Sequence, residues 1–413
     1  MAKSKRRRRM RWFAIALVGT LIMLMGAAWQ FWSSRHVAQW QLLRSVVDAD
    51  PVGPSSHEIQ MLAWNLAILG RDHEVRTLDF FPQYDRGRLQ VDPDRLELDP
   101  KPWRDALQTI AAKHRLVMIM EDHSVSKHRE MIGATLPLFR DAGFTHYAAE
   151  AIGESTRSLS TRGFPSIETG VYTSDPQFGN VLRRATGLGF QILGYDFRPF
   201  SHEAREQYAA GRLAELFENN TRAKVIVHAG FAHVYKRETD IGQRWLASLL
   251  WEKSGIEPFT IWQWSAMHEN HEYRVVAEAL SNSMDFREPV LLMPPPTFEQ
   301  GQANVPDVDA ILVHPPDTSV APNQRTVLFP DEKDRISGRW LGSESPVIIA
   351  AYPQGEPISA IPLDQVMLRE GEREFSLWVP GSVQPNIIVF DRHGRLESTV
   401  TRDQDGVTIE PLQ

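Results

Sequence analysis

Acidic residues and histidines recur in this sequence at the ends of short apolar runs. The strongest candidates for a site are Glu121, His123, Glu150, His228 and His233. A carboxylate or imidazole within hydrogen-bond reach of water can take its proton, which contributes roughly a hundredfold to ten-thousandfold in rate. These residue types therefore predict hydrolysis, and the catalytic candidates are Glu121, His123, Glu150 and His228.

The same side chains also suit a divalent metal. Catalytic zinc sites use three protein ligands and one water, and carboxylates accept manganese as well. The predicted ligands are His123, Glu150, His228 and His233, and the remaining carboxylate would act as the general base. Zinc or manganese is thus an expectation, and the sequence does not decide whether a metal is needed.

Further polar residues carry less weight. Asp196 ends another apolar run, where it would cap a helix or pair with Arg198. His268 and His271 are three residues apart and would share a helix face as ligands, or lie in a polar loop.

A structural role is the alternative for Glu121 and His123. They precede a helix expected to begin near Ser126, so they would cap it, and His128 and Arg129 would lie in its first turn near an anionic group. If the pair is instead catalytic, Glu121→Gln should abolish activity and leave the melting temperature nearly unchanged or raised.

Apolar runs of strand length alternate with helix-like segments and would position these residues. The runs are 115–120, 145–149, 190–195, 224–228, 258–264, 289–293 and 309–313, and the helical segments include 126–142, 176–187, 202–218 and 238–253. This alternation predicts an α/β fold, a mainly parallel mixed sheet with flanking helices, over residues 36–315. Ligands bind at the carboxyl ends of the strands in such a sheet, and neighbouring strands lie about 4.8 Å apart. The candidate side chains should therefore converge at those strand ends.

The last part of the chain has a different pattern. Residues 316–335 are rich in proline and are expected to form a linker. Residues 336–413 contain alternating apolar strands and turn signals, which predict a small all-β domain.

The N-terminus carries the one membrane signal. A basic segment, 1–11, precedes an uncharged apolar stretch, 12–32, whose helix of about 31 Å would span a hydrocarbon core of about 30 Å. By the positive-inside rule we expect a single-pass inner-membrane anchor with the body in the periplasm or on the extracellular side. Cleavage after a signal peptide ending near 26–28 is the alternative.

Composition excludes several classes of protein. Beyond Arg11 the chain carries 38 Lys and Arg against 52 Asp and Glu, a net charge of −14, so we expect no nucleic-acid partner. The chain has no cysteine, which excludes disulfides and thiolate chemistry. It contains neither a G-x-S-x-G elbow nor a G-x-x-x-x-G-K loop, and "HEARE" has Glu206 where a zincin needs its second histidine.

Four segments together suggest a family resemblance. They are "MEDHSVSKHRE", "YAAEA", "GYDFRP" and "VIVHAGFAHV". Over roughly residues 60–315 the sequence resembles the superfamily that joins erythromycin esterases, Tiki-type metalloproteases and ChaN-type haem-binding proteins. The resemblance implies an acid-and-histidine site at the strand ends and a small-molecule or peptide substrate; in the ChaN-type alternative it implies a non-enzymatic protein that binds haem or a metal. Met120 departs from the family pattern, which has glycine there, and only one residue separates Glu121 from His123.

Overall fold

The computed structural model describes most of the chain beyond residue 55. The described residues are 42–43, 45–47, 56–78, 92–150, 152, 156–170, 172–196, 201–238, 242–265, 271–298, 307–317, 322–381, 383–404 and 406–412. The expected basic segment 1–11, the expected anchor 12–32, Arg198 and His268 lie outside them. Within the described ranges, no helix has both the length and the apolar character needed to cross a membrane.

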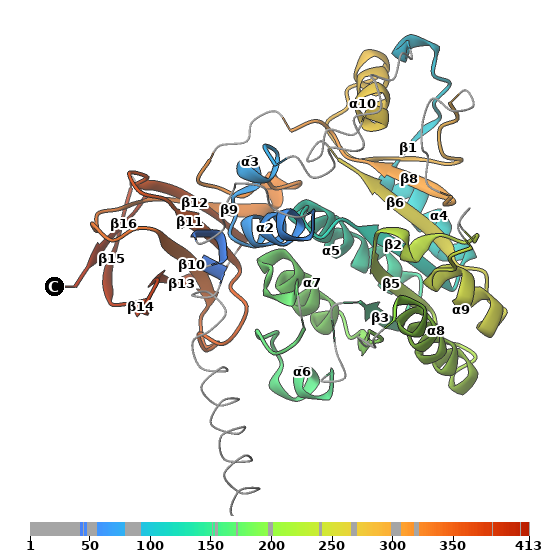
Figure 1. The fold of residues 1–413 in the computed structure, drawn as a ribbon, viewed down its shortest axis with the longest axis horizontal. Coiled ribbons are helices and arrows are strands. Elements are labelled where there is room, and N and C mark those ends of the chain that lie inside the picture. The colour runs from blue at the N-terminus through green and yellow to red at the C-terminus, as the bar shows by residue number, and fades with distance from the viewer. Residues whose placement is uncertain are drawn as a thin grey trace, which may run out of the picture.

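A mixed sheet forms the centre of the α/β body (Figure 1). Its strands are β1 (Pro100–Pro102), β2 (Leu116–Glu121), β3 (His146–Ala149), β4 (Gln191–Gly194), β5 (Val225–Gly230), β6 (Phe259–Trp264), β7 (Val290–Leu292) and β8 (Ala310–Val313). The order is β1-β7-β8-β6-β2-β5-β3-β4. Strands β8 to β4 pair in parallel, and β7 and β1 join antiparallel. The predicted α/β class and mainly parallel sheet are therefore confirmed.

The described helices pack on both faces of this sheet and, in part, against the C-terminal strands. They are α2 (Ser56–Ile68), α3 (Asp72–Val75), α4 (Trp103–Lys113), α5 (Ser126–Asp141), α6 (Thr156–Arg162), α7 (Pro176–Gly187), α8 (His202–Asn219), α9 (Leu246–Ser254) and α10 (His271–Ser283). One core cluster joins α4, α5 and α7 to the sheet, and a second joins α8 and α9 to it. Alternation along β2 sends Val117 and Ile119 to the first cluster and Met118 and Met120 to the second.

Two elements differ from the expectation. The helix expected over 238–253 begins only at Leu246, because Gly242 has a left-handed φ of 77° and Trp245 is extended. Strand β1 has the sequence PKP, which carries none of the apolar alternation by which strands are recognised.

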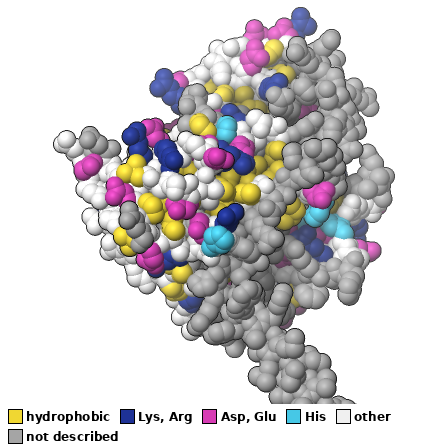
Figure 2. Space-filling model, turned by 60° about the vertical axis from the view of Figure 1, so that its left-hand side comes forward, with side chains coloured by type: hydrophobic (Ala, Val, Ile, Leu, Met, Phe, Trp, Pro, Cys, Tyr) yellow, Lys and Arg dark blue, Asp and Glu magenta, His cyan; other side chains and the backbone are white. Residues whose placement is uncertain are grey.

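The C-terminal strands form two four-stranded sheets, the β region of residues 333–411. The strands are β9 (Lys333–Trp340), β10 (Val347–Pro353), β11 (Asp364–Leu368), β12 (Glu374–Pro380), β13 (Pro385–Asp391), β14 (Gly394–Leu396), β15 (Ser398–Asp403) and β16 (Gly406–Pro411). The orders are β11-β10-β13-β14 and β12-β9-β16-β15, and one apolar core lies between them. Figure 2 shows acidic and basic side chains interspersed among hydrophobic ones on the face that it presents.

The segment before the β region lies against the α/β body. The Thr326 amide donates to Asp72, and the amides of Leu328 and Phe329 donate to Glu130. Arg325 is 1% exposed. The described part of the expected linker is thus ordered by contacts with the body, and the proposed domain boundaries stay predictions.

Candidate active site

The parallel strands bring the predicted residues together at one edge of the sheet. Strand β5 lies between β2 and β3, and its residue His228 is level with Ile119 of β2 and Ala149 of β3. Alternation then divides the site. Glu121 and His228 point to the α5 and α7 face, as Ile119 and Ile226 do, and Glu150 points to the α8 face, as Ala148 does.

An inner cluster surrounds Glu121, which is 1% exposed. Its Oε1 accepts from His123 Nδ1 at 2.8 Å, and its Oε2 lies 2.9 Å from His228 Nε2. Arg129 Nε, on α5, lies 2.6 Å from the same Oε2. His228 Nδ1 accepts from the Tyr147 hydroxyl at 2.6 Å. Each group of this cluster therefore holds the next in one orientation.

Neighbouring charges keep Glu121 ionised. Burial by itself would raise the pKa of Glu121, but Arg129, His228 and the His123 hydrogen bond outweigh it and hold the pKa well below the ordinary value. Burial and the nearby carboxylate raise the pKa of Tyr147 well above its ordinary value, so its hydroxyl remains a donor. It follows that the ionised Glu121 accepts a hydrogen bond from His123, which fixes Nδ1–H as the His123 tautomer, and that it lies beside His228 Nε2.

An outer cluster lies on the α8 face. Glu150 Oε1 accepts from Arg205 at 2.5 Å, and Arg205 also donates to Asp196 at 2.7 Å. His233 lies between Glu150, at 3.5 Å, and Glu206, at 2.9 Å. Burial alone would lower the pKa of His233, but these two carboxylates raise it to about 10. His233 is thus an imidazolium at neutral pH, and cannot act there as a base.

Gly230 joins the two clusters. Its amide donates to Glu150 Oε2 at 2.6 Å, and a Cβ at this position would stand 2.6 Å from His123 Cε1 and 2.7 Å from His123 Nε2. Only glycine therefore lets the His123 ring lie against the end of β5. His123 is 7% exposed, more than Glu121 or His228, so it is the inner group nearest to solvent.

Aromatic side chains flank the His123 ring. Trp64 of α2 meets it edge-on with centroids 5.0 Å apart, and Phe231 does so at 6.2 Å. Phe231 has a φ of 25°, which is rare for a residue with a side chain and is found most often at functional positions. Phe178 stacks on His228 at 5.0 Å.

The structure brings all five sequence candidates into these two clusters. Asp196 pairs with Arg205, and the side chain of His271 lies outside the description. The capping role for Glu121 and His123 finds no support, because Val125 precedes α5 and makes no side-chain cap.

Sequence reasoning missed several residues that complete the site. They are Tyr147, Asp175, Arg205, Glu206 and Gly230. The glycine directly after "VIVHA" was the available signal, since a strand-end glycine marks a close approach of backbone and side chain.

The arrangement does not fit a divalent metal. Glu121 is already paired with a buried guanidinium, and both nitrogens of His228 are engaged. A cation at Glu121 would have to displace Arg129, which is fully buried. Within the described ranges, no group of three or more His, Asp or Glu residues is placed to hold a metal ion.

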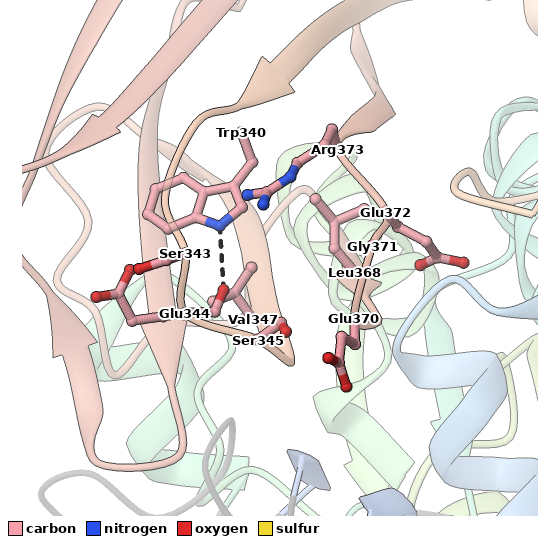
Figure 3. A pocket seen from close by; sticks show the side chains of 10 residues that line it. All are labelled: Trp340, Ser343, Glu344, Ser345, Val347, Leu368, Glu370, Gly371, Glu372 and Arg373. Carbon is pink, nitrogen blue, oxygen red and sulfur yellow. Dashed lines mark hydrogen bonds between the residues drawn. The ribbon is translucent and has the colours of Figure 1, made fainter.

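A separate cavity of about 270 Å³ lies in the β region (Figure 3). Trp340, Glu344, Glu370 and Arg373 are among its lining residues, and the Trp340 indole N–H donates to the Glu344 carbonyl at 3.2 Å. Residues of the inner and outer clusters are not part of its lining, so the cavity is distinct from the candidate active site.

Comparison with known proteins yields structural neighbours only. No family model and no curated protein matches the chain. The type III effector HopBA1 is similar with a TM-score of 0.34 and 14% identity, over 55% of this chain and 99% of that chain. RRSP, a MARTX toxin effector domain from Vibrio vulnificus CMCP6, is similar with a TM-score of 0.30 and 13% identity, over 54% of each chain. A third neighbour is the C-terminal region of Pasteurella multocida toxin, which is described with a thiol-protease-like catalytic triad. Its TM-score is 0.31 and its identity 14%, over 76% of this chain and 36% of that chain. The match thus spans about half of the second neighbour and about a third of the third.

Proposed function

We propose that this protein is a hydrolase of ester or amide bonds, in which Glu121 and His123 act as one unit. The observation that carries the proposal is the 2.8 Å contact between Glu121 Oε1 and His123 Nδ1, on a carboxylate that His228 and Arg129 also hold. A buried anion that orients an imidazole and stabilises its protonated form is the arrangement on which base catalysis by histidine depends.

The reaction uses water as the nucleophile. His123 Nε2 takes a proton from water while the water oxygen forms a bond to the carbonyl carbon, and the carbonyl electron pair moves to its oxygen. The imidazolium then returns the proton to the leaving oxygen or nitrogen as that bond breaks, which yields an acid and an alcohol or amine. Arg205 and the protonated His233 pair with the carboxylate of Glu150 and hold it in place beside the end of β5.

The proposal extends to the cellular location and membrane topology of the enzyme. The N-terminal charge pattern supports a single-pass inner-membrane anchor with the body in the periplasm or outside the cell. A topology reporter fused after Gln413 should be active only outside the cytoplasm, and activity inside would contradict the orientation. The resemblance to the erythromycin esterase, Tiki and ChaN superfamily supports a small-molecule or peptide substrate.

A panel of p-nitrophenyl esters and peptide p-nitroanilides tests the proposal. We expect turnover that His123→Ala lowers roughly a hundredfold or more, whereas His393→Ala, which changes an exposed histidine of the β region, leaves it unchanged. Because Arg129 occupies the place of a cation, a chelator should not reduce the rate. Loss of activity with EDTA and recovery with zinc or manganese would contradict this mechanism, and a haem absorbance band in the purified protein would favour the ChaN-type alternative.

A further inference from the structure

A chain of buried charges runs from the candidate active site to the β region. Its members are Glu121, Arg129, Asp175, Arg325 and Asp364, called the charge chain below. Each of them is at most 1% exposed. Charges alternate in sign along it, so each member is neutralised by its neighbours in a medium where an unpaired charge is costly.

The first links lie within the α/β body. Arg129 contacts Glu121 through Nε at 2.6 Å and Asp175 through Nη1 at 3.0 Å. Asp175 is held in turn at the start of α7, where it accepts from the Gln177 amide at 2.7 Å. Arg129 therefore has one position in which both carboxylates are satisfied.

The last links cross into the β region. Arg325 Nη1 lies 3.7 Å from Asp175 and donates to Ser126 Oγ at 2.7 Å, and Ser126 Oγ donates to Asp175 at 2.5 Å. Arg325 Nε donates to Asp364 at 2.9 Å. Asp364 also accepts from the Trp378 amide of β12 at 2.8 Å, so its place is set by the C-terminal sheets.

Arg325 reaches His123 by a second route. It donates to the carbonyls of Ala67 at 2.7 Å and Ile68 at 2.9 Å, at the end of α2. The same helix carries Trp64, whose indole packs edge-on against the His123 ring. One guanidinium therefore supports both the carboxylate that orients His123 and an aromatic wall beside it.

We propose that Arg325 and Asp364 are positioning residues for Glu121 and His123, and that the β region is a working part of the catalytic unit. The inference rests on the proposed hydrolase function. Replacing a buried ion pair with apolar residues is often neutral or stabilising, so stability alone is a weak reason for a chain of five buried charges. The charge chain begins at Glu121, which orients His123, and ends at Asp364 in the β region. Orientation of Glu121 and His123 is therefore the role that we assign to it.

The test compares Asp364→Asn with a matched control in the full chain. Asn keeps the size and the acceptor for the Trp378 amide but loses the charge that Arg325 needs. Glu356→Gln is the control, because Glu356 also joins the β region to α7, through Arg183, and lies outside the charge chain. We expect Asp364→Asn to lower kcat for p-nitrophenyl esters roughly tenfold to a hundredfold with KM nearly unchanged, and Glu356→Gln to alter neither.

A second readout needs no substrate. The Nε proton of buried Arg129, assigned by its loss in Arg129→Lys, should give a shifted NMR signal in Asp364→Asn and an unchanged one in Glu356→Gln. If the wild type hydrolyses nothing, the hydrolase proposal fails, and this signal still decides the positioning. Folded Asp364→Asn with wild-type kcat and signal, or equal losses in Glu356→Gln, would overturn the inference. If Asp364→Asn does not fold, Arg325→Lys is read in the same way, and failure of both to fold would show a purely structural role.

Discussion

Replacing Glu121 with glutamine tests the centre of the site. The glutamine Oε1 replaces only one of the two acceptor oxygens, and the amide NH2 that replaces the other is a donor and would face a second donor, either His123 Nδ1–H or His228 Nε2–H. Arg129 would keep its contact with Asp175 but lose the carboxylate of Glu121. The variant therefore loses both the tautomer control of His123 and the neutralisation of a buried cation.

The expected effects follow from these contacts. Turnover should fall roughly a hundredfold to ten-thousandfold because the base is no longer oriented. Breaking one side of a buried ion pair costs about 3–5 kcal/mol, and since Asp175 remains we expect the lower end, about 3 kcal/mol. The sequence alone led us to expect a melting temperature nearly unchanged or raised. The burial of Arg129 against Glu121 now predicts a decrease of several degrees.

Activity and unfolding are measured on the wild type, Glu121→Gln and the control Glu130→Gln. Glu130 is a buried glutamate of α5 outside the site, and glutamine can still accept one of its two backbone amides. Because the folded-state pKa of Glu121 is depressed, its stabilisation is present above the unfolded value near 4.5 and is lost as the pH falls toward the folded value. The stability gap between wild type and Glu121→Gln should therefore narrow below about pH 4.5. Wild-type turnover in Glu121→Gln, or a gap that does not change with pH, would refute the reasoning.

Two further predictions follow from the packing. Gly230→Ala places a Cβ 2.6 Å from the His123 ring, so kcat should fall roughly a hundredfold while the protein stays folded, since Gly230 has an ordinary φ of −79°. Gly133→Ala, with a nearest contact of 3.2 Å to Val181, is the control and should keep its activity; equal rates in both would contradict the steric argument. Limited proteolysis should spare residues 322–335, because the amides of Thr326, Leu328 and Phe329 are bonded to the body. A folded core released by cleavage there would show that this segment is a linker after all.

The local pattern of the sequence was sufficient to predict the framework of the site. Apolar runs separated by helix-like segments predicted the parallel strands to within two residues, because a strand buried on both faces must be apolar throughout. The polar residue that ends such a run stands at the sheet edge. Glu121, Glu150 and His228 were found for that reason.

What the sequence could not provide is the order of the strands and the partners across them. The runs at β2, β3 and β5 look alike, so only packing decides that β5 lies between the other two. The partners Arg205 and Asp175 lie 55 and 46 positions along the chain from Glu150 and Arg129, and no local signal marks them.

Tertiary structure also decided how the C-terminal part of the chain contacts the α/β body. Its composition predicted a proline-rich linker followed by an independent β domain, and these are properties of local sequence. The sequence shows that Arg325 and Asp364 are charged, but it does not show that they form an ion pair. Ion pairs carry no periodicity, and their position depends on which surfaces the apolar cores bring together. The sequence by itself thus determined which groups are available for chemistry, and the packing of the helices and sheets decided which of them lie together.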